Sequence, residues 1–154
     1  MGRSLKRGFT IVEVVIMTSL VMTTVGFSLF GLSSVTKSQN RYQMHYLLSL
    51  NEYNIIQIIK NDHAFYAHPE DYFGDVSLIE KTSTGTQQHI TLYFDKNNNL
   101  CDSGVYEGYI KIICTPTTST SNTRYYYTLQ KYMKNNNHLD VRQGGIVNFT
   151  VYDA

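Results

Sequence analysis

The feature that most constrains this chain is an apolar run near its N-terminus. From Phe9 to Leu32 the sequence holds 24 residues with a single charged side chain, Glu13. A helix of that length spans about 36 Å, against about 30 Å for the hydrocarbon core of a bilayer. The run therefore predicts a transmembrane helix. It also raises the question of why an acid lies inside it, because a charge in hydrocarbon costs about 2.5–3.5 kcal/mol or more.

The flanks of the run predict its topology. Arg3, Lys6 and Arg7 precede it, and the sequence turns polar after Leu32. The positive-inside rule then places the N-terminus in the cytoplasm and the C-terminal body outside, in a single-pass cell membrane protein. The run is longer than the apolar region of a secretory signal and no clean small-residue cleavage site follows it, so we expect the helix to be retained.

Two local explanations for Glu13 stay open. It lies four residues, about 6 Å, from the start of the run, where the helix dipole favours an acid. Protonation would also remove the charge. Neither explanation accounts for the residues Lys6-Arg7-Gly8 at this distance before the acid.

The stretch KRGFTIVE carries a resemblance to a known family. A short basic leader ending in Gly8, followed by Phe9, Thr10, two aliphatic residues and Glu13, resembles the cleavage and methylation motif of type IV prepilins and pseudopilins. The resemblance implies that a prepilin peptidase cuts between Gly8 and Phe9 and that the new Phe9 amine is N-methylated. This amine would then pair with Glu13 of a neighbouring subunit in a filament, which would satisfy the acid.

The resemblance also implies the partners and the location of the chain. Other pilin or pseudopilin subunits would bind through the N-terminal helix, with membrane lipid around that helix before assembly. The prepilin peptidase/methyltransferase and an inner-membrane assembly platform would act on the chain, which would end in an extracellular pilus or pseudopilus. The helix contains Gly26 and Gly31 but lacks the proline of many major pilins, which favours a minor subunit that initiates, caps or decorates the filament. The alternative is a membrane-anchored extracellular binding module whose helix is only a tether.

A second helical stretch continues from residue 33 to residue 61 without proline or glycine. Its apolar residues recur at spacings of three, four and seven and predict one apolar face. They are Met44, Leu47, Leu48, Ile55, Ile58 and Ile59. The expected organisation is a leader (1–8), a transmembrane and assembly helix (9–32), an amphipathic helix (33–61) and an extracellular sheet domain (62–154).

The remainder of the chain predicts an antiparallel sheet. Five runs rich in Ile, Val, Thr, Tyr and Phe are separated by turn-forming segments, with no helix between them. They are VSLIEK, HITLYF, YIKIIC, RYYYTLQKY and IVNFTVYD. Alternation places Val147, Phe149 and Val151 on one face, so that face can pack against the helix. The predicted fold class is α+β, a long N-terminal helix packed on an antiparallel sheet of four or five strands, as in type IV pilins.

One strand suggests nucleic acid as a partner. RYYYTLQKYMK interleaves tyrosines with cations, as single-strand binding surfaces do. Successive strand residues face opposite sides, so Tyr125 and Tyr127 share a face that Tyr126 does not, and one of the two faces is expected to be core. The chain has 13 basic and 12 acidic residues, three of the basic ones in the leader, and so lacks the basic excess of a nucleic-acid-binding domain. DNA stays a partner to test, without further support.

One cluster suggests a metal, in a segment expected to be a connecting loop. His63, His68, Glu70 and Asp71 would serve a secreted metal-dependent hydrolase. The two histidines are five residues apart, however, and no HExxH pattern is present, so a polar loop is the better interpretation.

The stretch DKNNNLCDSGVYEG suggests calcium, because Asp95, Asn97 and Asn99 alternate as ligands do. An EF-hand needs glycine at its sixth position and glutamate at its twelfth, where this chain has Leu100 and Tyr106. An EF-hand is therefore not expected. A looser site of Asp95, Asp102 and Glu107 stays open beside a plain asparagine-rich hairpin.

No nucleophile elbow, phosphate-binding loop or dinucleotide fingerprint occurs, so we expect neither an enzyme nor a cofactor. Cys101 and Cys114 are the only cysteines. In an exported chain they could form a disulfide or stay reduced and buried, and the sequence leaves both states open.

Overall fold

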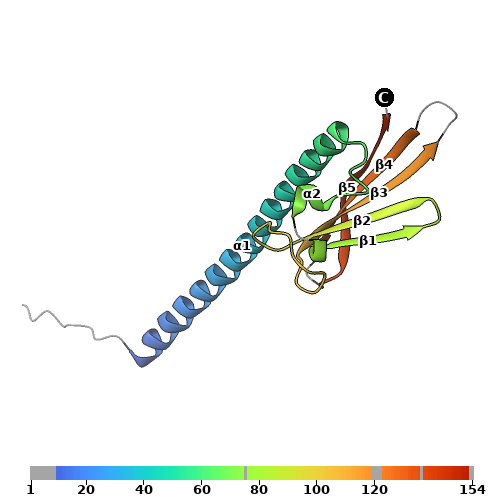
Figure 1. The fold of residues 1–154 in the computed structure, drawn as a ribbon. Helices are drawn as coiled ribbons and strands as arrows, with labels where there is room; N and C mark the ends of the chain where they lie inside the picture. The colour runs from blue at the N-terminus through green and yellow to red at the C-terminus, as the bar shows by residue number, and fades with distance from the viewer. Residues whose placement is uncertain (1–9, 75, 119–122, 136, 153–154) are drawn as a thin grey trace, which may run out of the picture. The chain divides into compact units, whose positions relative to one another are not determined.

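The computed structural model of the 154-residue chain describes residues 10–74, 76–118, 123–135 and 137–152. These residues form one long helix followed by a five-stranded antiparallel sheet, so the α+β prediction is confirmed (Figure 1). The chain divides into two compact units, one up to Arg41 and the other from Tyr42 onward. The predicted processing residues Gly8 and Phe9 lie outside the described residues.

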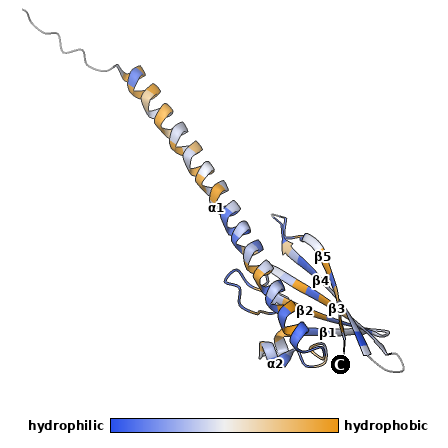
Figure 2. Ribbon diagram, turned by 90° about the horizontal axis from the view of Figure 1, so that it is seen from above, coloured by the Kyte–Doolittle hydropathy of each residue, from blue (hydrophilic) through white to orange (hydrophobic). Residues whose placement is uncertain are grey.

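Helix α1 runs from Ile11 to Asn61 without interruption and ends where the sequence predicts a stop. In the N-terminal unit its residues are exposed, apart from a half-buried Gly26. Hydrophobic residues recur on its successive turns (Figure 2). Among the described residues, α1 is the one helix that is long and apolar enough to cross a membrane.

The sheet belongs to the second unit and is a simple meander. Each strand pairs antiparallel with the next in sequence, so β1 and β5 are its edges. The strands are β1 (Ile79–Thr84), β2 (Gln87–Phe94), β3 (Gly108–Thr118), β4 (Thr123–Lys134) and β5 (Asp140–Tyr152). Five strands without an intervening helix agree with the turn-rich spacing of the sequence.

Two local elements differ from the sequence-based expectation. The segment before β1 was expected to be a loop leading into a strand at Val76, but it contains a short helix α2 (Glu70–Phe73) and a 3₁₀ turn η1 (Val76–Leu78). Pro69 precedes α2 and Gly74, with φ of +79°, ends it. One-turn elements of this kind carry too few residues to produce a periodic pattern.

Strand β5 starts six residues earlier than predicted, because Gly144-Gly145 was interpreted as a turn. Opposite β4, Val147 pairs with Leu129, and pairing resumes between Gln143 and Lys131. Three residues of β5 thus oppose one residue of β4. Gly144 has φ of +71°, which glycine adopts without strain, so the glycines form an irregularity within the ladder.

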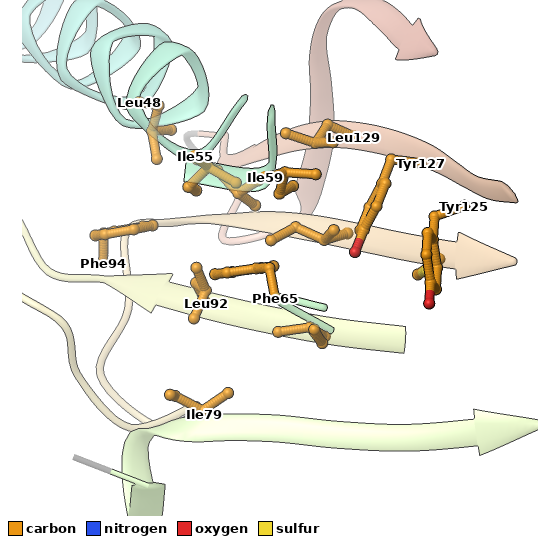
Figure 3. Packing of buried hydrophobic residues seen from close by; sticks show 14 of the residues in the cluster. Leu48, Ile55, Ile59, Phe65, Ile79, Leu92, Phe94, Tyr125, Tyr127 and Leu129 are labelled. Atoms are coloured by element: carbon orange, nitrogen blue, oxygen red, sulfur yellow. The ribbon is translucent and has the colours of Figure 1, made fainter. Parts of the chain in front are cut away.

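The core lies between the inner face of the sheet and residues 44–59 of α1. Leu48, Ile55 and Ile59 point from the helix toward the sheet (Figure 3). Alternation along β4 buries Tyr125 and Tyr127 and leaves Tyr126 exposed, as predicted. On β5 the predicted face of Val147, Phe149 and Val151 is half-buried and packs against this core, with the Phe149 ring stacked on Tyr127 at 5.6 Å.

The helix approaches the sheet closely at Gly108. A Cβ atom at this position would lie 2.7 Å from Leu48 Cδ1 and 3.0 Å from the Tyr132 carbonyl oxygen. Glycine therefore sets how closely α1 packs on β3.

Candidate functional site

The start of α1 is a capping box built from Thr10 and Glu13. The Thr10 backbone N–H and hydroxyl donate to Glu13 Oε2 at 2.9 and 3.1 Å, and the Glu13 N–H donates to Thr10 Oγ1 at 3.3 Å. This reciprocal bonding satisfies N–H groups that a helix start leaves without partners. We expected the helix dipole to favour an acid this close to the start of the helix. The structure adds specific hydrogen-bond donors from Thr10 to that explanation. The pattern T-x-x-E in the sequence was the signal for it.

The other polar side chains of the apolar run bond to their own helix. Between Ile11 and Leu32 each of the five hydroxyl side chains donates to a backbone carbonyl three or four residues earlier, at 2.7–3.0 Å. They are Thr18, Ser19, Thr23, Thr24 and Ser28. Such bonding lets hydroxyl groups sit in an apolar environment, so Glu13 is the polar group of the run that most needs an explanation.

A second acid, Glu52, lies within the buried stripe of α1. Its Oε2 is 2.5 Å from Lys131 Nζ of β4, both side chains are about nine-tenths buried, and Lys131 also donates to Ser49 Oγ at 3.2 Å. Among the described residues, Glu52 Oε1 has no hydrogen-bond partner. We did not predict this pair, although Glu52 lies four residues after Leu48 and Lys131 alternates with buried Leu129. Sequence periodicity therefore places both residues on buried faces, although it does not show that they pair with each other.

The histidine-rich segment uses its polar groups locally. Glu70 accepts from Lys81 Nζ at 2.6 Å, and His68 Nδ1 lies 3.8 Å from the same carboxyl. The Lys81 hydrogen bond holds the Glu70 pKa below its usual value. The His63 ring packs 5.6 Å from the Tyr125 ring, and Asp71 is exposed. In the part of the chain that the structure describes, no three His, Cys, Asp or Glu residues are arranged to hold a metal.

The asparagine-rich loop between β2 and β3 folds around Asp95. Its Oδ1 accepts from the N–H groups of Asn97 and Asn99 at 2.8 Å each, which lowers the Asp95 pKa. Asn98, with φ of +66°, contacts α1 through Asn51 Nδ2, which donates to Asn98 Oδ1 at 2.7 Å. The loop is thus a hairpin connection that contacts α1 through Asn98. Asp102 and Glu107 remain exposed.

The two cysteines are free thiols, and they lie beside opposite ends of β2. Cys114 pairs in register with Gln88 of β2, whereas the Cys101 N–H bonds to the Tyr93 carbonyl oxygen. Those two β2 positions are five residue steps apart, about 17 Å, which no disulfide spans. Burial raises the Cys114 pKa to about 11, so this thiol stays protonated at neutral pH.

The outer face of the sheet carries the aromatic residues of interest for a nucleic-acid partner. Tyr126 is exposed, and the Arg124 guanidinium lies 5.5 Å from the centroid of the Tyr152 ring. Four further tyrosines pack together on this side, with ring centroids 4.7–5.6 Å apart. They are Tyr93, Tyr106, Tyr109 and Tyr132. Their mutual contacts leave each ring only partly exposed.

No family model, curated protein or solved structure matches the chain. The described residues define an α+β protein whose sheet packs on the second part of a helix, and whose helix begins with an exposed apolar segment long enough to span a membrane.

Proposed function

We propose that the chain is a filament subunit that is anchored in the membrane by its N-terminal helix before assembly. More narrowly, we propose a minor subunit of a type IV pilus or pseudopilus, without enzymatic activity. The observation that carries the proposal is Glu13, an acid in the first turn of α1, where it is the one charged residue of the exposed apolar segment up to Leu32. Its place five residues after Gly8 matches the prepilin motif that it resembles.

The proposed chemistry creates a partner for Glu13. Cleavage after Gly8 frees the Phe9 amine, which keeps its positive charge after one methylation. A neighbouring subunit's amine then pairs with the Glu13 carboxylate when the apolar helices leave the lipid and pack together. The free-energy cost of a carboxylate in an apolar environment is lower when it is paired with an amine than when it is alone. The pair therefore favours the packing register in which a neighbour's amine meets Glu13.

A membrane-tethered binding module is the second candidate, and the capping box favours it. Because Thr10 already satisfies Glu13 Oε2, a tether could keep the acid for helix capping alone. The two functions differ in what they need from residue 13. A capping box accepts Glu or Gln, whereas a pair with an amine needs the negative charge.

Glu13→Gln separates the two functions. The filament account predicts that this variant inserts into the membrane normally but is lost from sheared filaments by tenfold or more, because the cap remains and the charge does not. Thr18→Val is the matched control, since it is also isosteric and removes a hydroxyl that bonds only within its own helix. The measurement is the amount of chain in filament and membrane fractions. Equal recovery of Glu13→Gln, Thr18→Val and the wild type in filaments would support the tether.

A further inference from the structure

Strand β5 forms one edge of the sheet and has a long open side. It pairs with β4 alone, so in the part of the chain that the structure describes no strand lies along its other side. With 13 residues it is the longest of the described strands, whereas β1 at the opposite edge has 6 residues. The backbone N–H and C=O groups along such an edge are a template for pairing with another extended chain.

The ladder shows which backbone groups of β5 are open. Both groups of one strand residue point to the same side, and successive residues alternate. The Lys134 N–H donates to the carbonyl oxygen of Glu107, directly before β3, so even-numbered residues of β4 point toward β3 and odd-numbered residues toward β5. Tyr127 therefore points toward β5, where it lies opposite Phe149. The residues that alternate with Phe149 point their backbone groups away from the sheet. They are Asn148, Thr150 and Tyr152.

Residues 146–152, called the β5 edge below, lack the features by which sheet edges normally avoid pairing. Natural edges are short, carry charges or proline, or are interrupted by bulges. Strand β1 follows this rule, because it is short and has two charged residues. The first part of β5 also follows it, with Asp140, Arg142 and the irregularity at Gly144. The β5 edge itself has the sequence IVNFTVY, without charge or proline.

The side chains along the β5 edge define the chemistry of a strand that fits it. On the core side Val147, Phe149 and Val151 are only half-buried, so apolar surface continues to the edge. On the outer side lie Asn148 and Thr150, which are polar and uncharged. An extended segment that alternates apolar with uncharged polar residues matches both sides, whereas a charged segment would place charges beside the apolar strip.

A second copy of the chain does not fit the β5 edge. Two β5 edges would pair antiparallel about a two-fold axis normal to the sheet. That axis also reverses the direction of residues 44–59 of α1, which pack on the sheet, so two chains anchored in one membrane could not pair in this way. The β1 edge of a second copy is short and charged. The fitting occupant is therefore a strand of a different protein.

We infer that the β5 edge is a docking site for a partner protein, which adds one uncharged extended segment of about seven residues to the sheet. The segment bonds to the open backbone groups of Asn148, Thr150 and Tyr152, and its apolar side chains cover the half-buried strip. The inference goes beyond the proposed function, because it does not depend on the Glu13 charge. It applies to a filament subunit and to a tethered module alike.

A model strand tests the inference on the detergent-solubilised full chain. The probe is a fluorescent, lysine-tailed peptide of alternating valine and threonine, about seven residues long. Thr150→Pro removes one outward N–H and leaves the bonds to β4, whereas Thr150→Ala keeps that N–H and is the matched control. We expect fluorescence anisotropy to show binding to the wild type and Thr150→Ala, and binding weaker by about tenfold or more to Thr150→Pro. Absence of binding to the wild type, or equal binding to all three proteins, would overturn the inference.

Hydrogen exchange in the wild-type chain locates the peptide without relying on the proline variant. The peptide should slow exchange of the Asn148, Thr150 and Tyr152 amides by about tenfold or more. The Val147 and Phe149 amides, which already face β4, should change much less. The same peptide N-methylated at every residue lacks backbone donors and should give no such protection. Protection confined to other parts of the chain, or equal protection by the N-methylated peptide, would contradict docking at the β5 edge.

Discussion

Two glutamates show how this chain accommodates acids in apolar positions. Glu13 is satisfied within one helical turn by Thr10, and that arrangement is exposed and open to competition from another partner. Glu52 is buried, and its Oε2 atom is paired with Lys131 across the helix–sheet interface. The first arrangement suits an acid that exchanges partners, whereas the second suits one that fixes where the helix sits on the sheet.

The buried pair gives a prediction about stability. Lys131→Met should lower the free energy of unfolding by about 3–5 kcal/mol, because it leaves the Glu52 charge buried without a partner. The double variant Glu52→Leu/Lys131→Met should recover most of that loss, since two apolar side chains can replace the pair. Denaturant unfolding of the detergent-solubilised full chain, followed by circular dichroism, measures both. Lys111→Met, on the outer face of β3, is the control and should change stability by less than about 0.5 kcal/mol. If Lys131→Met behaved like Lys111→Met, the pair would be irrelevant to stability.

At the scale of elements, strong periodicity was predictable and glycine-dependent geometry was not. The end of α1 and the five strands follow from helical and alternating patterns in the sequence. The predicted start of β5 was wrong, because Gly144-Gly145 resembles a turn. In the structure the glycines lie between the β5 residues that pair with Leu129 and Lys131 of β4. Such pairing is a long-range property that a local pattern does not contain.

Gly108 gives the prediction that belongs to this scale. Gly108→Ala should destabilise the sheet unit by about 1–3 kcal/mol, because the added methyl group meets the Tyr132 carbonyl oxygen, which is backbone and cannot swing away. Gly104→Ala is the matched control, since its Cβ would meet nothing within 4 Å and its φ is not positive. Thermal unfolding of the two variants in parallel measures the difference. Equal melting temperatures would show that the helix does not depend on close approach at β3.

At the scale of the whole molecule, the sequence predicted the acid of the candidate site but not its surroundings. Glu13 was recognisable because a charge in an apolar run is conspicuous. Its partner Thr10 was missed although the capping pattern was present, and the β5 edge became visible only once the strand order and pairing were known. Polar clusters that suggested metals were explained by local bonds to Lys81 and to backbone N–H groups. Sequence position alone cannot distinguish such bonds from metal coordination.

The most direct test of the central claim is mass spectrometry of the chain recovered from sheared filaments. The account predicts a chain that starts at Phe9, carries one added methyl group on its N-terminal amine and retains the entire apolar helix. The Gly8→Asp variant should keep the leader and be absent from filaments. A recovered chain that starts at Met1, that is cut after the apolar run, or that never appears in the filament fraction would contradict the account.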